Sequence, residues 1–266
     1  MDFTQAHVSF MVKQYFEEGF RSRWKLEEYS DPNKPCVFFG LYTEEDRNIF
    51  LNHKSYSIVI WGGGEFNDAN ILLAANKEKS ILIGYGWMIE KYKTLGIPYQ
   101  KVILPVKDYS MFKPSPLGDK VYVYAGIHGN RHGYFKWDSM IKPLFKEYGE
   151  DKFIFTSYRD IDELIEEYYN NCFLYIKPNE KGGSTAMWEL GLMGRKTVAN
   201  SQGSLPNVIE YSTIDDIKKT IDTEAKKIGT IQDTLAKEVN NCLMNTNEWL
   251  NLTYYEEYFN RRANTR

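Results

Sequence analysis

The segment from residue 173 to residue 201 constrains the fold more than any other part of the chain. Its parts, in order, are an apolar run (173–176), a loop with two glycines (177–185), a run of helix-forming residues (186–193) and a second apolar run (197–199). Leu, Met, Glu and Ala favour a helix, and Gly194 is suited to end it. This order predicts a βαβ unit in which the glycines lie at the N-terminus of the helix.

The loop has the features of an anion-binding site. Gly182 and Gly183 allow the backbone to approach a ligand closely, and the first amides of a helix have no partner within it. The helix dipole adds positive potential at the same point, which favours a phosphate. Ser184 and Thr185 can cap the helix and can also donate hydroxyls to a ligand. An ordinary βα turn with a Ser/Thr cap would share these residues, so the glycines alone leave both interpretations open.

Two glutamates favour the ligand-binding interpretation. Glu180 precedes the glycines and Glu189 lies inside the predicted helix. A carboxylate beside a phosphate site suits the binding of hydroxyls, as the acidic residue of a dinucleotide fold binds a ribose. Residues 178–200, PNEKGGSTAMWELGLMGRKTVAN, resemble the donor-binding signature of GT-B glycosyltransferases, in particular the retaining group-1 family. The resemblance implies that Glu189 binds the donor nucleotide.

The spacing of the glutamates departs from that family. There the first glutamate lies eight positions before the second, whereas Glu180 lies nine before Glu189 and Lys181 occupies the family position. If the loop holds one extra residue, Glu180 is the catalytic carboxylate at the donor sugar. If the spacing is literal, Lys181 faces the sugar instead. Glu180 is the expected catalytic residue, because a carboxylate stabilises the positive charge that develops at the anomeric carbon.

The first part of the chain alternates between helix and strand patterns. Apolar residues at three- and four-residue steps from Val8 to Phe20 predict a helix that opens residues 1–34. Buried strands are expected at 36–41, 56–61, 80–84 and 101–105, with helices between them. This alternation is typical of a parallel sheet, which binds ligands at the carboxyl ends of its strands.

One of those strand ends carries a run of glycines. In the resembled family this domain faces the acceptor, so the residues after the second expected strand are assigned to the acceptor side: Gly62, Gly63, Gly64 and Glu65. Such glycines would let two bound molecules approach closely, and Glu65 is a candidate contact to the acceptor. A tight strand–helix turn explains the same glycines equally well.

The second half of the chain repeats the alternation after a linker at residues 106–120. The strand expected at 121–125 ends in Gly126, and the resemblance assigns Arg131 and Lys136 to the donor diphosphate. Cations there would neutralise charge on the departing nucleotide. Tyr158 follows the next strand and could stack on the donor base. A solvated loop with ordinary cations is the alternative.

These features predict an α/β protein with two Rossmann-like domains in the GT-B arrangement and a donor cleft between them. Residues 1–112 form the expected acceptor-side domain and residues 113–230 the nucleotide-sugar domain. Residues 231–266 are expected to be helical and to pack back on the first domain, as the final helix does in the resembled family.

Composition limits the function further. The 266 residues carry a formal net charge of −3 and no basic tract with interleaved aromatic residues, which argues against nucleic-acid binding. Three dispersed cysteines indicate free thiols, and four histidines lack metal-ligand spacing. Neither a signal peptide nor a membrane-spanning run is evident, so a cytoplasmic location is expected.

The sequence therefore predicts transfer of a sugar from a UDP- or GDP-linked donor to a hydroxyl of a carbohydrate or other acceptor. Retention of configuration is expected, with no metal ion and no cofactor apart from the donor itself. A nucleotide-sugar epimerase or hydrolase of the same fold would need acid/base groups near Glu65 or His128. A non-catalytic nucleotide-binding assembly protein is the other alternative.

Overall fold

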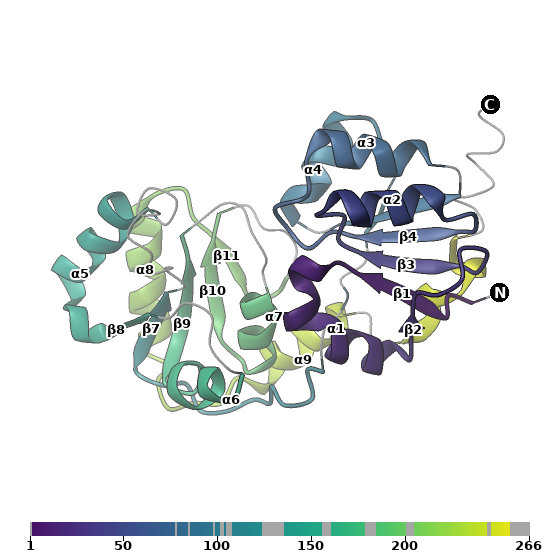
Figure 1. Cartoon of the computed structure of the whole chain (residues 1–266). Coiled ribbons are helices and arrows are strands. Elements are labelled where there is room, and N and C mark those ends of the chain that lie inside the picture. Colours follow the sequence, from purple (N-terminus) through teal and green to yellow (C-terminus); the bar gives the residue numbers. More distant parts are fainter. Residues whose placement is uncertain are drawn as a thin grey trace. The chain divides into compact units, whose positions relative to one another are not determined.

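The chain forms two compact units, each built on a parallel β-sheet (Figure 1). The computed structural model describes residues 2–77, 79–84, 86–97, 99–101, 104, 108–123, 136–155, 161–178, 185–200, 205–243 and 246–255. The first unit comprises Met1–Tyr109 and Leu243–Arg266, and the second Ser110–Cys242. The sequence places divisions at residues 112 and 230, whereas α9 (Asp233–Cys242) belongs to the second unit.

The sheet of the first unit has six strands in the order β2-β1-β3-β4-β5-β6, and all neighbours pair in parallel. The strands are β1 (Gln5–Val8), β2 (Glu27–Glu28), β3 (Cys36–Phe39), β4 (Ser57–Ile60), β5 (Ser80–Gly84) and β6 (Gln100–Lys101). Helix α1 (Phe10–Trp24) covers one face; α2 (Glu44–Asn52), α3 (Asp68–Asn76) and α4 (Gly86–Thr94) cover the other (Figure 1).

Two apolar cores hold these layers together. Phe20 and Trp24 of α1 pack with Phe39 of β3 on one face, together with Trp249 of η5 (Asn247–Leu250). The opposite face joins strand residues such as Phe38 to α2, α3 and α4. Because both faces are covered, the central strands β3 and β4 are buried and almost entirely apolar, and they lack the alternation of a half-exposed sheet.

The N-terminus differs from the sequence expectation. The chain begins with strand β1, and the helix starts only at Phe10. Val8, assigned to the helical stripe, is the last residue of that strand and is buried in the core. The helical period of the following residues concealed a strand of only four residues, half of which are the polar Gln5 and His7.

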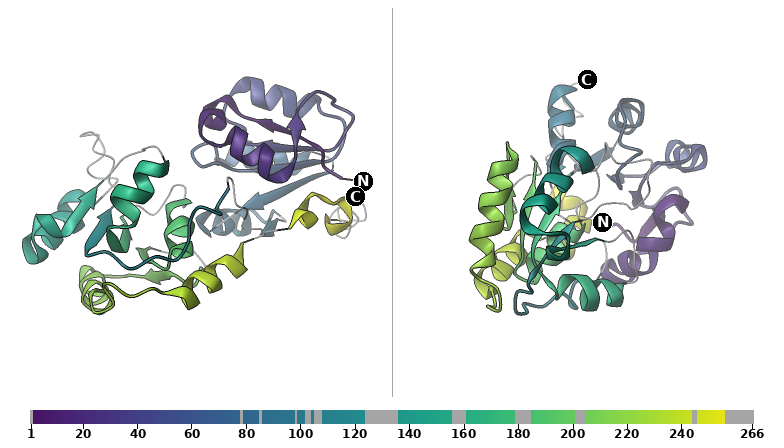
Figure 2. Two further views of the ribbon diagram at one scale, coloured as in Figure 1. Left: turned by 90° about the horizontal axis from the view of Figure 1, so that it is seen from below. Right: turned by 90° about the vertical axis from the view of Figure 1, so that its left-hand side faces the viewer.

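The sheet of the second unit has five parallel strands in the order β11-β10-β9-β7-β8. They are β7 (Lys120–Val123), β8 (Phe153–Phe155), β9 (Cys172–Lys177), β10 (Lys196–Ala199) and β11 (Val208–Glu210). Residues of η2 (Trp137–Ile141), α5 (Lys142–Tyr148) and α8 (Ile214–Ala225) pack in one core with β7, β9 and β10. Figure 2 gives two further views of these layers. Two parallel sheets covered by helices confirm the expected α/β class.

The helix after β9 is α7 (Thr185–Leu192), and its end is well defined. Gly194 has a positive φ of 87°, a conformation that glycine adopts without strain. The Arg195 amide donates to the Leu190 carbonyl (2.8 Å) and the Gly194 amide to that of Gly191 (3.0 Å). These two bonds form a Schellman motif, so the predicted stop at Gly194 is confirmed.

Arg195 has a second role, which the sequence does not reveal. Its guanidinium is buried and donates to the Ser115 carbonyl (3.0 Å), the Pro116 carbonyl (2.8 Å) and the Met193 carbonyl. Next in the chain, Gly118 lies so close to Asn171 that a Cβ atom would stand 2.1 Å from its backbone carbon. The segment that leads into β7 is therefore fixed to the second unit.

Candidate functional site

The strand order of the second unit indicates where a ligand is expected to bind. From β7 the chain passes to β8 on one side and then to β9 on the other, so the order reverses between β7 and β9. In open α/β sheets, ligands bind at the carboxyl ends of the strands at this switch point. Residues 124–135, which follow β7, and residues 179–184, which follow β9, include six of the ten residues that the sequence assigns to the donor site.

Several of those residues lie outside the part of the chain that the structure describes. They are Gly126, Arg131, Tyr158, Glu180, Gly182, Gly183 and Ser184, together with Lys181 and His128. Their assignments remain sequence predictions. Lys136, Thr185 and Glu189 are described in the second unit, and the whole run from Gly62 to Glu65 is described in the first.

Lys136 lies beside the start of the glycine-containing loop. It precedes η2 with a left-handed φ of 50°. Its ammonium donates to the Tyr211 hydroxyl at 3.4 Å and stands 5.7 Å from the centre of that ring. The same hydroxyl donates to the Pro178 carbonyl at 3.4 Å. The contacts connect a cation assigned to the diphosphate with Pro178, the last described residue before positions 179–184.

Lys177 was overlooked in the sequence, where it served only to mark the end of a strand. It is the last residue of β9, the central strand, and its side chain is 1% exposed. Burial lowers the pKa of its ammonium to about 8. A lysine that ends an apolar strand immediately before a glycine-containing loop is the signal that could have identified it. By the two-residue repeat of a strand it shares a face with Tyr175.

Glu189 is part of a buried polar cluster under α7. Its side chain is 2% exposed, and its Oε2 atom accepts a hydrogen bond of 2.7 Å from the Tyr169 hydroxyl. Tyr169 packs edge-on against Tyr122, which stacks on Tyr175. Burial raises the pKa of the Tyr169 hydroxyl, which therefore acts as a donor. Glu189 contributes to the packing of α7, whatever contact it makes with a ligand.

Thr185 begins α7 and is half-buried. The sequence places Thr185 in the loop as a possible cap, whereas the helix already includes it; its assignment to the donor remains a prediction.

In the first unit, the Glu65 carboxylate is hydrogen-bonded within the turn that contains it. The Gly62 amide donates to its Oε1 atom at 2.5 Å, and the Tyr42 hydroxyl lies next to the same carboxylate. Burial raises the pKa of the Glu65 carboxyl. Gly63 has a φ of 149°, and no atom lies within 4 Å of a Cβ built on Gly64. The turn therefore uses Glu65 to hold its shape and leaves open space at Gly64.

A second polar cluster lies at the switch point of the first sheet, between β1 and β3. The Asp46 carboxylate accepts hydrogen bonds from His7 Nε2 (2.8 Å), Ser9 Oγ (2.6 Å) and the Thr43 amide (2.8 Å). Burial alone would raise the pKa of Asp46, but these donors outweigh it and lower the pKa to about 2. No local sequence pattern reveals this cluster, because His7 and Asp46 are far apart in the chain.

Within the described residues, no group of three or more His, Cys, Asp or Glu side chains is placed to hold a metal ion. None of the described helices is long and apolar enough to span a membrane.

No protein-family model matches this chain, and a search of curated protein sequences also finds no match. Among solved structures, the fold is similar to that of a sucrose-phosphate synthase from Thermosynechococcus elongatus. The two share 12% sequence identity with a TM-score of 0.55, over 93% of this chain and 76% of the other. At this level of identity the similarity is one of fold, and function has to be argued from the site.

Proposed function

We propose that this protein is a GT-B glycosyltransferase. It moves a sugar from a nucleoside diphosphate sugar to a hydroxyl of a carbohydrate or other acceptor, with retention of configuration and without a metal ion. The observation that carries the proposal is the position of Lys136 and Lys177. Lys177 ends β9 where the chain enters the glycine-containing loop, and Lys136 is connected to Pro178, the next residue, through the Tyr211 hydroxyl. Similarity of fold to a sucrose-phosphate synthase supports it.

The donor diphosphate is assigned to the N-terminus of α7. Amides of the first helical turn, with the hydroxyls of Ser184 and Thr185, donate to its oxygens. Arg131 and Lys136 neutralise the charge that develops on the departing nucleotide, which is the work that a metal ion does in other transferases. Lys177, one residue before Pro178, adds a cation: burial lowers its pKa to about 8, so the ammonium is still mostly protonated at pH 7.

Recognition of the sugar and the ribose is assigned to the two glutamates. Glu180 stabilises positive charge at the anomeric carbon. Glu189 accepts hydrogen bonds from the ribose, while its Oε2 atom accepts a hydrogen bond from the Tyr169 hydroxyl. Gly126 and Tyr158 border the nucleotide. The acceptor is assigned to the first unit, where the open space at Gly64 adjoins the turn that Glu65 stabilises.

The proposal is tested by product analysis. The protein is incubated with UDP- and GDP-linked sugars in EDTA, with and without a panel of hydroxyl acceptors, and the products are separated and their anomeric configuration assigned by NMR. Transfer that requires an acceptor, persists in EDTA and retains configuration supports the proposal. If the sugar is epimerised or hydrolysed whether or not an acceptor is present, the protein is an epimerase or a hydrolase. Strict dependence of the reaction on manganese or magnesium would contradict the assignment of Arg131 and Lys136 to the diphosphate.

A further inference from the structure

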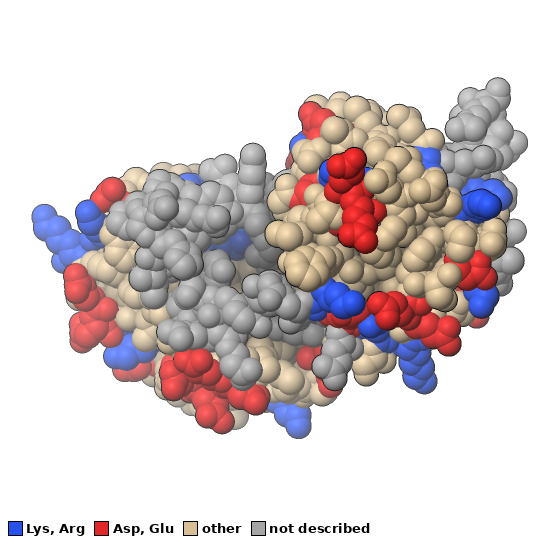
Figure 3. All heavy atoms as spheres, viewed as in Figure 1, with Lys and Arg blue, Asp and Glu red and all other residues tan. Residues whose placement is uncertain are grey.

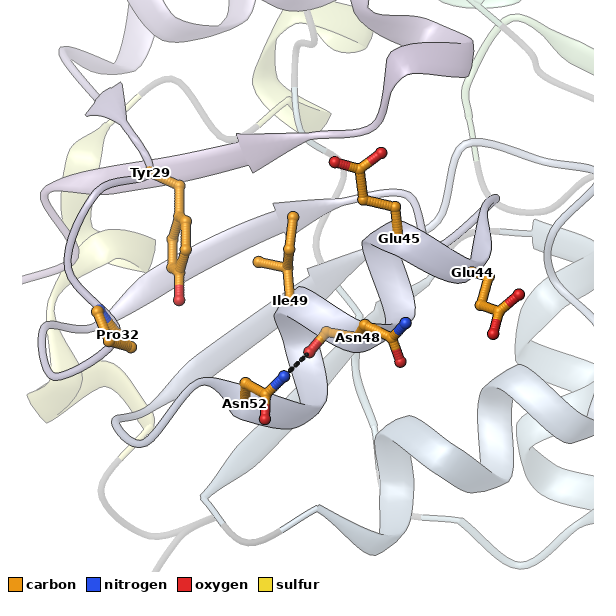
Figure 4. Close-up of a pocket in the computed structure, with 7 residues that line it drawn as sticks. All are labelled: Tyr29, Pro32, Glu44, Glu45, Asn48, Ile49 and Asn52. Carbon is orange, nitrogen blue, oxygen red and sulfur yellow. Dashed lines mark hydrogen bonds between the residues drawn. The ribbon is translucent and has the colours of Figure 1, made fainter.

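A groove of about 570 Å³ lies on the first unit, between helix α2 and the segment that follows β2. The groove is shallow and largely open to solvent. The residues that line it are Tyr29, Pro32, Glu44, Glu45, Asn48, Ile49 and Asn52 (Figure 4). Two come from the strand side and five from α2, so the groove follows the helix along its length.

The strand side of the groove is a fixed aromatic surface. The Tyr29 ring is half-buried and packs against three other rings, with centroid distances of 6.2 Å to His7, 6.0 Å to Phe38 and 5.7 Å to His53. Burial lowers the pKa of His53 to about 4, so its ring is neutral at pH 7. Tyr29 thus offers a rigid, largely apolar wall, opposite the aliphatic side chain of Ile49 (Figure 4).

The helix side supplies hydrogen-bonding groups. Glu45 and Ile49 project from α2 on one side, and Glu44 and Asn48 on another, as four-residue spacing dictates (Figure 4). Asn52 donates to the Asn48 carbonyl at 2.9 Å. No lysine or arginine is among the lining residues, and the acidic side chains over α2 lie in largely uncharged surface (Figure 3). This charge disfavours phosphate and other anions.

An apolar wall with amide and carboxylate groups beside it suits a sugar ring. The C–H face of a pyranose packs on aromatic and aliphatic carbon, while its hydroxyls need donors and acceptors at the rim. We infer that this groove binds the distal sugar units of a saccharide acceptor, an inference that rests on the proposed function for its substrate class. The helix is about 13 Å long at 1.5 Å per residue, which gives room for more than one ring.

The position of the groove fits such an acceptor. Glu44 follows the cap residue Thr43 at the carboxyl edge of the sheet, near the Asp46 cluster, and Asn52 lies at the other end of the helix. A saccharide whose reactive end lies at the carboxyl edge can therefore extend away from it along α2. The first-turn acids also stabilise the helix dipole, which explains their presence in part but not the aromatic wall opposite them.

The test compares a groove variant with a matched control. The variant is Glu45→Ala with Asn48→Ala, and the control is Glu90→Ala with Asn76→Ala, exposed residues of α4 and α3. Malto-, cello- and chito-oligosaccharides of one to four units are titrated by saturation-transfer NMR, with spermidine as a cationic probe. Thermal unfolding establishes that both proteins are folded.

At least one series should bind, with affinity rising at least tenfold from one to three units. The groove variant should bind the longest ligand at least tenfold more weakly than the unaltered protein does. The control should bind as the unaltered protein does. No binding by any series, equal loss in both variants, or binding of spermidine alone would overturn the inference. These titrations need no nucleotide. Loss of saccharide binding with nucleotide binding intact would refute the inference about the groove alone, whereas loss of nucleotide binding would refute the proposed transferase.

Discussion

Lys136 and Lys177 reach the same edge of the second sheet from different elements, and only one could be assigned from the sequence. Lys136 follows the segment that begins at Gly126, where the resembled family has an arginine and then a lysine. Lys177 ends an apolar strand, and only the structure reveals that its ammonium is buried. For Glu65 the sequence suggests a role that the structure does not show. Its position after three glycines suggests an acceptor contact, whereas its carboxylate accepts a hydrogen bond from the Gly62 amide of the same turn.

Replacing Lys177 should affect stability and binding in opposite directions. Because its pKa is lowered from 10.5 to about 8, the folded protein holds this proton less tightly than the unfolded chain. The stability of the unaltered protein should therefore rise as pH increases from about 8 to about 10. Lys177→Met should raise the free energy of unfolding at pH 7 by about 1–3 kcal/mol and weaken UDP or GDP binding. Denaturant titration and calorimetry measure both, and a loss of stability without change in affinity would assign Lys177 a purely structural role.

Asp46 should make the first unit sensitive to acid. Its folded pKa of about 2 lies below the ordinary 3.8, and the difference corresponds to about 2 kcal/mol. That stability is present above about pH 4 and is lost as pH falls toward 2. Asp46→Asn should flatten this part of the pH–stability curve, measured by urea unfolding. Asp68→Asn, at an exposed carboxylate in the first turn of α3, is the control. An unchanged curve would contradict the role of His7 and Ser9 as donors.

The register of the glycine-containing loop decides between Glu180 and Lys181. A one-residue bulge at Gly182 and Gly183 costs little, and a carboxylate suits the developing positive charge better than an ammonium does. Glu180→Gln should lower turnover at least tenfold with little change in nucleotide affinity, and Lys181→Gln should have a smaller effect. Steady-state kinetics on both variants gives the ranking. The reverse ranking would place Lys181 at the sugar.

The end of a helix or strand could be predicted from the sequence where a single residue determines it. Gly194 ends α7 because a positive φ is required there, and the sequence shows the glycine directly. Strand β1 was missed because four residues give too short a pattern against the helix that follows. The polar cluster of His7, Ser9 and Asp46 depends on β1 lying beside β3, a contact that no local pattern contains.

The segment before β7 should be sensitive to small changes. Arg195 bonds the Ser115 and Pro116 carbonyls with two nitrogens of one planar group, which lysine cannot reproduce. Arg195→Lys should therefore destabilise the second unit by about 1.5–3 kcal/mol, since the Ser115 and Pro116 carbonyls lose hydrogen bonds from a charged donor. Gly118→Ala should do the same through its collision with Asn171. Gly64→Ala, at a glycine with open space around it and no positive φ, is the comparison for the second change.

Unfolding of each variant by guanidinium, followed by circular dichroism, measures these effects. If Arg195→Lys and Gly118→Ala unfold at the same denaturant concentration as the unaltered protein, the segment is not fixed as the structure shows.

At the scale of the whole molecule, the sequence predicts the two α/β units well. Alternating apolar strands and helices follow from local periodicity, and their number requires two sheets. The exact divisions and the path of the chain after residue 230 could not be predicted. They depend on whether α9 packs on the second unit, and its amphipathic pattern fits either partner.

Calorimetric titration with UDP, GDP and their sugars tests the central claim most directly. The account predicts binding of at least one of them with a dissociation constant between about 1 µM and 1 mM, which is roughly −8 to −4 kcal/mol. Lys136→Ala should weaken it by about 1.5–3 kcal/mol, the value of a charge-assisted contact, while Lys142→Ala, at an exposed lysine of α5, should not. Failure of every nucleoside diphosphate and nucleotide sugar to bind the unaltered protein would contradict the account.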